Sequence, residues 1–191
     1  MRRLRWLRCL FGASALAMVL SSCGQATGPA ASSAPAAPPI RPAQDQPAPA
    51  NASESATVSF EVTTLEGGKF AVSGAPGRPV VLYFMAAWCT SCLPEAKALA
   101  TLQEKYQGDN VDVLVLDVDP SDTPADLRSF KEAAGLAKHW AFDVEGRVTK
   151  AYQVQALDST IVIAPDGRIV YRDGRPTSLE ILDKAVKQAL Q

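Results

Sequence analysis

The chain has 191 residues, and its 19 lysines and arginines nearly balance 20 aspartates and glutamates, which gives a net charge of −1 at pH 7. A chain without an excess of basic residues is not expected to bind nucleic acid. The sequence also contains neither a glycine-rich phosphate loop nor a dinucleotide-binding fingerprint.

Residues 1–22 have the pattern of a secretory signal. Four arginines and no acidic residue lie in this segment, and an apolar run over residues 9–20 follows the arginines. The run is shorter than the roughly 20 residues that span a bilayer, and a basic start before a short apolar run is typical of a signal peptide. We therefore expect residues 1–22 to be removed, which leaves 15 basic and 20 acidic residues and a net charge of −5.

The signal ends in Leu20-Ser21-Ser22-Cys23, which resembles the lipobox of bacterial lipoproteins. In those proteins the cysteine becomes the first residue and carries the lipid. The resemblance implies an extracytoplasmic protein that is anchored to a bacterial membrane by a lipid on Cys23. An uncleaved membrane anchor and an ordinary secretory cleavage further along the chain are the alternatives.

Residues 23–56 form a predicted tether. Positions 24–56 contain 7 prolines, 11 alanines and 4 serines, and Ile40 is their only large aliphatic residue. Such a segment buries too little apolar surface to offset the entropy lost on ordering it, and its prolines keep it partly extended. We expect a disordered spacer between the anchor and the folded domain.

Residues 57–191 have the composition of a single globular domain. Residues 58–64 and 69–73 alternate apolar and polar positions around a Glu-Gly-Gly turn, which indicates a β-hairpin. The continuous apolar run over residues 79–85 predicts a strand that is buried on both faces. A helix is then expected from the cysteine pair to about Tyr106.

The second half of the domain continues this alternation of strands and helices. Residues 111–118 predict another buried strand, and Thr123 and Asp126 predict the cap of a helix that ends near Gly135. The alternation indicates an α/β fold in which helices cover a mixed sheet. The remaining predicted elements are a strand at 139–143, a short helix at 146–154, an antiparallel strand pair at 159–164 and 168–173, and a last helix at 178–190 that opens with a capping box of Thr177 and Glu180.

Cys89 and Cys92 lie where the strand at 79–85 gives way to a helix. Unpaired N–H groups and the helix dipole stabilise an anion at a helix N-terminus, and this setting lowers the pKa of a cysteine. Cys89 is therefore the expected thiolate, and Cys92, one turn further in, is placed to resolve a mixed disulfide. The spacing by itself also fits a zinc site, a copper site or a structural disulfide.

The segments VVLYFMAAWCTSCLPE and STIVIAPDGRIV resemble the thioredoxin fold and, within it, the membrane-tethered TlpA/ResA-type thiol–disulfide reductases. The added N-terminal hairpin agrees with that branch. The resemblance implies that Cys89 attacks, that Cys92 resolves and that Trp88 flanks the pair. It also implies protein thiol or disulfide substrates, a membrane-embedded thiol as the electron donor, and a role such as reducing the haem-attachment cysteines of apocytochrome c in cytochrome c biogenesis. We expect a monomer without a cofactor.

Two positions depart from the family pattern. Tyr83 stands where many thioredoxins carry a buried acid, so Glu95 is the nearest acidic candidate for proton handling, although a solvated charge on the helix face is the simpler interpretation. Asp158 stands where the family usually has a proline in a cis peptide bond, before the strand at 159–164. A cis bond without proline costs about 3–4 kcal/mol, so we expect a differently shaped loop. A carboxylate beside the thiols would oppose thiolate formation.

Other uses of the cysteine pair remain open. A zinc site needs about four ligands, and the domain offers two cysteines and His139, so no metal site of this kind is expected. A copper(I) metallochaperone needs only two thiolates, but related chaperones usually add a histidine near the last hairpin, where this chain has none. A binding module with a structural disulfide is a further alternative. A peroxidase is disfavoured because such enzymes generally carry their cysteine in a different loop.

Overall fold

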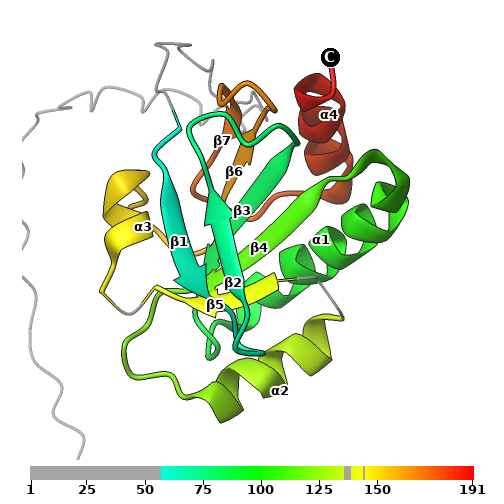
Figure 1. Cartoon of the computed structure of the whole chain (residues 1–191). Coiled ribbons are helices and arrows are strands. Elements are labelled where there is room, and N and C mark those ends of the chain that lie inside the picture. Colours follow the sequence, from blue (N-terminus) through cyan, green and yellow to red (C-terminus); the bar gives the residue numbers. More distant parts are fainter. Residues whose placement is uncertain (1–56, 136–138, 144) are drawn as a thin grey trace, which may run out of the picture. The chain divides into compact units, whose positions relative to one another are not determined.

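Strand β3 (Val80–Met85) lies at the centre of a five-stranded sheet with the order β5-β4-β3-β6-β7 (Figure 1). Strands β4 and β5 run parallel to β3, whereas β6 pairs with β3, and β7 with β6, in the antiparallel sense. The computed structural model describes residues 57–135, 139–143 and 145–191, so the predicted signal, Cys23 and the whole predicted tether lie outside the described residues. The other strands of the sheet are β4 (Asp112–Asp117), β5 (His139–Phe142), β6 (Ser159–Ile163) and β7 (Ile169–Arg172).

All six residues of β3 are buried, as the continuous apolar run predicted. Successive side chains of a strand point to opposite faces of the sheet, so β3 contributes to two separate apolar layers. Val81 and Tyr83 belong to the layer beneath helices α1 (Leu93–Lys105), α2 (Pro124–Ala134) and α4 (Leu179–Ala189). Their neighbours Leu82 and Phe84 belong to the layer on the opposite face.

The opposite face is covered by the N-terminal hairpin and by the short helix α3 (Arg147–Ala151) (Figure 1). The hairpin consists of β1 (Phe60–Thr63) and β2 (Lys69–Val72), which pair antiparallel as predicted. It is joined to the edge of the sheet by a backbone hydrogen bond of 2.7 Å from Leu65 N–H to the carbonyl oxygen of Trp140. The predicted mixed sheet with helices on it and an added hairpin is therefore confirmed.

The two predicted helix caps had different outcomes. Thr123 and Asp126 form the predicted capping box at the start of α2. The predicted box of Thr177 and Glu180 is wrong, because α4 is capped by Ser178, whose side chain accepts from the N–H of Ile181. Thr177 is turned inward instead, and its N–H donates to the buried carboxyl group of Glu95.

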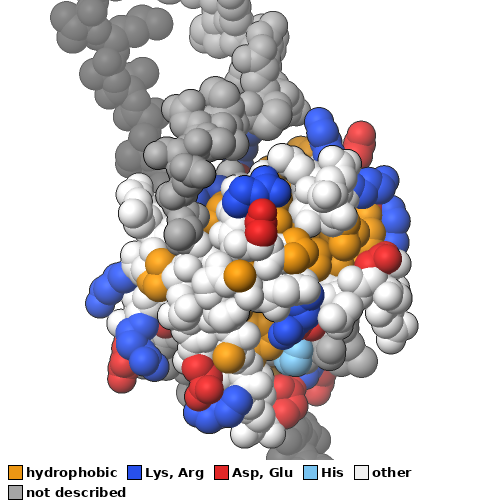
Figure 2. Space-filling view, turned by 45° about the horizontal axis from the view of Figure 1, so that its top comes forward, with side chains coloured by type: hydrophobic (Ala, Val, Ile, Leu, Met, Phe, Trp, Pro, Cys, Tyr) orange, Lys and Arg blue, Asp and Glu red, His pale blue; other side chains and the backbone are white. Residues whose placement is uncertain are grey.

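Acidic and basic side chains are interspersed over the face of the molecule shown in Figure 2. None of the helices within the described residues is long and apolar enough to cross a membrane.

Candidate redox site at the end of strand β3

The cysteine pair follows directly from the carboxyl end of β3. Cys89 N–H donates to the carbonyl oxygen of Ala86 over 2.9 Å, which turns the chain away from the sheet. A single turn of 3-10 helix, η1 (Thr90–Cys92), comes next and leads into α1. The predicted helix therefore begins as a 3-10 turn and becomes α-helical only at Leu93. Cys89 and Cys92 are joined by a disulfide, with their Cα atoms 5.4 Å apart.

The two cysteines differ in their access to solvent. Cys89 is 5% exposed and Cys92 is fully buried, whereas the neighbouring Trp88 is 62% exposed. Cys89 caps the first helical turn, where backbone N–H groups and the helix dipole favour a negative sulfur. The Trp88 indole N–H donates to a carboxylate oxygen of Asp119 over 2.6 Å, which fixes the ring beside the pair.

Glu95 is buried, which corrects the simpler interpretation of a solvated charge on the helix face. It is 2% exposed, and its two carboxyl oxygens accept from the Thr160 hydroxyl at 2.6 Å and from the Thr177 N–H at 2.7 Å. Burial raises the pKa of Glu95 to about 8, against these two hydrogen bonds, and the negative charges of Asp158 and Asp173 raise it further. An acid that titrates near neutral pH thus lies one helical turn beyond Cys92.

Asp158 lies beneath the cysteine loop. Its side chain is buried, and a carboxylate oxygen accepts from the Tyr83 hydroxyl over 2.5 Å. The same hydroxyl lies 2.9 Å from the carbonyl oxygen of Cys92. The backbone of Asp158 has a φ of 62°, in the left-handed region that few residues other than glycine adopt, and its N–H donates to Phe84. The loop at the position of the family's proline is therefore built around this aspartate.

Tyr83 occupies the position at which many thioredoxins carry a buried acid, and acidic side chains from other parts of the chain lie near it. Tyr83 is itself fully buried, and its pKa is raised by burial and by the carboxylates of Asp158 and Glu95. Two acidic groups from other elements therefore surround the position at which the chain lacks an acid.

Two further acidic side chains, Asp117 and Asp122, lie at and after the carboxyl end of β4. Asp122 accepts from the N–H of Ala87 over 2.7 Å. Asp117 is fully buried, and burial, together with the charges of Asp122 and Asp119, raises its pKa to about 7. The acids at and after the end of β4 and the cysteines after β3 lie near one another because the two strands are parallel and end at the same edge of the sheet.

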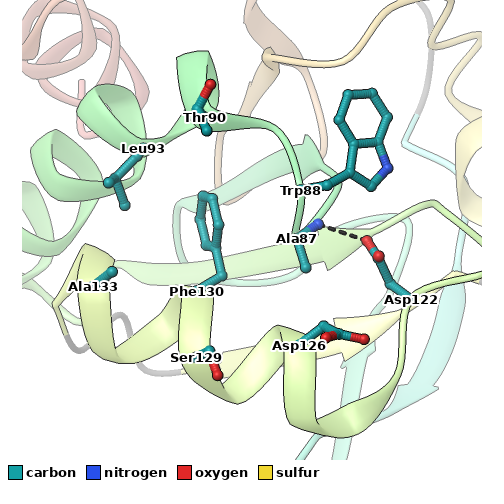
Figure 3. Close-up of a pocket in the computed structure, with 9 residues that line it drawn as sticks. All are labelled: Ala87, Trp88, Thr90, Leu93, Asp122, Asp126, Ser129, Phe130 and Ala133. Atoms are coloured by element: carbon teal, nitrogen blue, oxygen red, sulfur yellow. Dashed lines mark hydrogen bonds between the residues drawn. The ribbon is translucent and has the colours of Figure 1, made fainter. Parts of the chain in front are cut away.

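A pocket of about 360 Å³ lies between the cysteine loop and helix α2 (Figure 3). In Figure 3 the ring of Phe130 rises from α2 toward the loop, and Asp122 and Asp126 lie at the end of the pocket near Trp88. The remaining lining residues are Ala87, Thr90, Leu93, Ser129 and Ala133.

The partners of Glu95 and the acids beside the loop were not among the predicted site residues. Thr160 and Thr177 lie 65 and 82 residues beyond Glu95, so no local pattern links them to it. Asp117, Asp119 and Asp122 did carry a signal, because they lie at or just after the end of a strand that was predicted to be buried. The described residues hold no group of three or more His, Cys, Asp or Glu side chains placed to bind a metal ion.

Comparisons with known proteins agree with this arrangement. Residues 54–172 match the AhpC/TSA family. The thiol–disulfide oxidoreductase ResA of Bacillus thuringiensis subsp. konkukian is 29% identical over 130 residues, which cover 68% of this chain and 74% of that protein. A thioredoxin-like protein from Aeropyrum pernix is 28% identical, with a TM-score of 0.59 over 68% of this chain and 89% of that one.

A further solved structure is that of a secreted Mycobacterium tuberculosis disulfide oxidoreductase, described as homologous to DsbE of E. coli. It is 25% identical, with a TM-score of 0.58 over 68% of this chain and 95% of that one. The predicted thioredoxin-like fold is thus confirmed. The chain belongs to the AhpC/TSA family and is a thioredoxin-like thiol–disulfide oxidoreductase with a Cys89–Cys92 pair.

Proposed function

We propose that this protein is an extracytoplasmic reductase of protein disulfides that works through Cys89 and Cys92. The observation that carries the proposal is the asymmetry of the pair: Cys89, which is 5% exposed, lies at a helix start beside an exposed tryptophan, and Cys92 is fully buried. An accessible thiolate with a shielded partner three residues away is the arrangement that disulfide exchange needs.

In this reaction the Cys89 thiolate attacks one sulfur of a substrate disulfide. A mixed disulfide forms and the first substrate thiol leaves. Cys92 then loses its proton and attacks the Cys89 sulfur, which forms the Cys89–Cys92 disulfide and releases the second substrate thiol. The substrate gains two electrons and two protons, and a membrane-embedded thiol donor restores the reduced pair by the reverse exchange.

Glu95 is the proposed proton acceptor and donor for Cys92. It follows Cys92 by three residues, so both side chains lie within one helical turn. A carboxyl group with a pKa of about 8 exchanges protons readily near neutral pH, and proton transfer is most effective when the pKa lies near the working pH. Trp88 is proposed to form an aromatic wall of the site. The negative charge of Asp158 is proposed to oppose formation of the Cys89 thiolate.

The proposed location rests on the N-terminal sequence. A signal at residues 1–22, a lipid on Cys23 and a spacer at residues 23–56 would hold the domain at a bacterial membrane, at a reach of at most about 100 Å if the spacer is fully polyproline-like. The secreted relative from Mycobacterium tuberculosis supports an extracytoplasmic site of action. The proposed substrates include the haem-attachment cysteines of apocytochrome c, and the domain would act as a monomer.

A turnover assay separates this function from its alternatives. The wild-type domain, supplied with a dithiol, should reduce a model protein disulfide over many cycles, and Cys89→Ser should abolish turnover. A copper(I) chaperone would instead bind one cuprous ion tightly through both sulfurs with negligible turnover. A binding module with a purely structural disulfide would show neither turnover nor tight copper(I) binding.

A further inference from the structure

We infer that the pocket beside Trp88 binds a segment of the substrate protein that carries an apolar side chain next to a lysine or arginine. The inference rests on the proposed exchange function and names the kind of substrate that the site favours. It concerns only the polypeptide around the substrate's reactive cysteine.

The pocket is placed to receive a chain that is reacting at Cys89. Its upper wall is Ala87, Trp88 and Thr90, which flank Cys89 on both sides in the sequence. A substrate whose sulfur reaches Cys89 can therefore lay its neighbouring residues along this wall. Trp88 is 62% exposed, so a large aromatic surface is available for contact.

The floor of the pocket is apolar. Leu93 from α1 and the buried ring of Phe130 from α2 form it, and Ala133 continues it along α2 (Figure 3). A volume of about 360 Å³ holds one or two aliphatic side chains of a peptide. The floor therefore favours an apolar residue near the reactive cysteine.

The rim of the pocket is acidic. The charged residues among its lining are Asp122 and Asp126, and Asp119 adjoins them through its hydrogen bond with the Trp88 indole. Asp126 is exposed, and its pKa is lowered by hydrogen bonds from Thr123, so it is ionised at neutral pH. Complementary charge selects partners and speeds their encounter, so this rim favours a basic residue and disfavours an acidic one.

Two synthetic peptides test the inference. Both carry a leucine beside a single cysteine and differ only in a lysine or a glutamate two positions further on. Each cysteine is supplied as a mixed disulfide with 2-nitro-5-thiobenzoate. In a single turnover the reduced protein releases the coloured thiolate when Cys89 attacks the peptide sulfur. Cys92 then releases the peptide thiol, and the protein is left as its disulfide.

The readout is the ratio of the rate constants for the lysine and glutamate peptides, because a general loss of reactivity cancels in it. We expect a ratio of about tenfold at low salt that falls toward one as salt screens the charges. Asp126→Asn should lower the ratio about threefold, and Glu132→Gln, which removes an exposed charge elsewhere on α2, should leave it unchanged. Ala133→Lys should lower the ratio as well, and Ala125→Lys, on the same helix outside the pocket, should affect it less.

The outcomes distinguish the inference from the function on which it rests. If both peptides react at equal rates and no pocket variant changes their ratio, the inference is wrong and the exchange function stands. If neither peptide nor an uncharged small disulfide reacts with the reduced protein, the proposed function itself fails.

Discussion

The hydroxyl of Tyr83 lies 2.5 Å from a carboxylate oxygen of Asp158. Because the same hydroxyl is 2.9 Å from the carbonyl oxygen of Cys92, Tyr83 connects this aspartate to the backbone of the cysteine loop. Within the described part of the chain, the second carboxylate oxygen of Asp158 is buried and has no hydrogen-bond partner. A negative charge at this place is poorly compensated, so it should act on the nearby thiolate.

We predict that Asp158→Asn lowers the pKa of Cys89. Coulomb's law with an effective dielectric near 20 and an assumed separation of about 6 Å gives a destabilisation of a thiolate by a carboxylate on the order of 2–3 kcal/mol, more than the roughly 0.3–1 kcal/mol that a helix N-terminus contributes. Without this repulsion the reduced form is stabilised, so the reduction potential becomes less negative, by about 30 mV for each tenfold change in the exchange constant. Thiolate absorbance against pH and a redox titration measure the two effects.

Asp158→Pro should shift both quantities in the same direction. Glu180→Gln is the matched control, because it removes an exposed negative charge at the start of α4. If both Asp158 variants keep the wild-type pKa and potential, the aspartate has no redox role despite its position.

Glu95 and Asp117 should make the domain more stable at acidic pH. Burial raises their pKa values from 4.5 to about 8 and from 3.8 to about 7, so the folded protein binds more protons than the unfolded chain between these limits. The stabilisation of the protonated forms is complete below about pH 4 and is lost as the pH rises toward the folded-state values. Between pH 5 and 7, each group should lower the free energy of unfolding by up to about 1.4 kcal/mol per pH unit.

Denaturant unfolding of the oxidised domain at several pH values measures this slope. Glu95→Gln should remove its share of the slope, because glutamine does not titrate, while Glu132→Gln on the exposed face of α2 should keep the wild-type slope. An unchanged slope in Glu95→Gln would show that this buried carboxyl group keeps an ordinary pKa.

Most of the fold could be predicted because its signals are local. The apolar run of β3, the alternation in the hairpin and the cap at Thr123 each depend on residues close together in the chain. The burial of Glu95 could not be predicted, because its partners Thr160 and Thr177 reach it only after β6 and the start of α4 have packed against α1. The cap at Thr177 was misassigned for the same reason, since its N–H is committed to Glu95 and leaves Ser178 as the cap.

The order of reactivity of the two thiols follows from their burial. Alkylation of the reduced domain with a limiting amount of reagent should modify Cys89 first, because Cys92 is fully buried. Peptide mapping of the labelled protein identifies the modified residue. Preferential labelling of Cys92 would reverse the proposed roles of the two cysteines.

The membrane anchor can be tested separately from the redox site. If Cys23 carries a lipid, Cys23→Ser should move the protein out of the membrane fraction and leave the melting temperature of the domain unchanged, because the predicted tether separates the two. Ser22→Ala, next to it, is a conservative control. A variant that stays in the membrane fraction would favour an uncleaved signal as the anchor.

The central claim is that Cys89 and Cys92 form a reducing couple, and the reduction potential of this pair tests it most directly. The potential is measured by equilibrating the domain with a series of glutathione or dithiothreitol redox buffers and quantifying the free thiols by alkylation. We predict a value of about −250 mV or lower, in the range of thioredoxin-like reductants. A value near about −120 mV, typical of a strong oxidant, would contradict the reductase assignment.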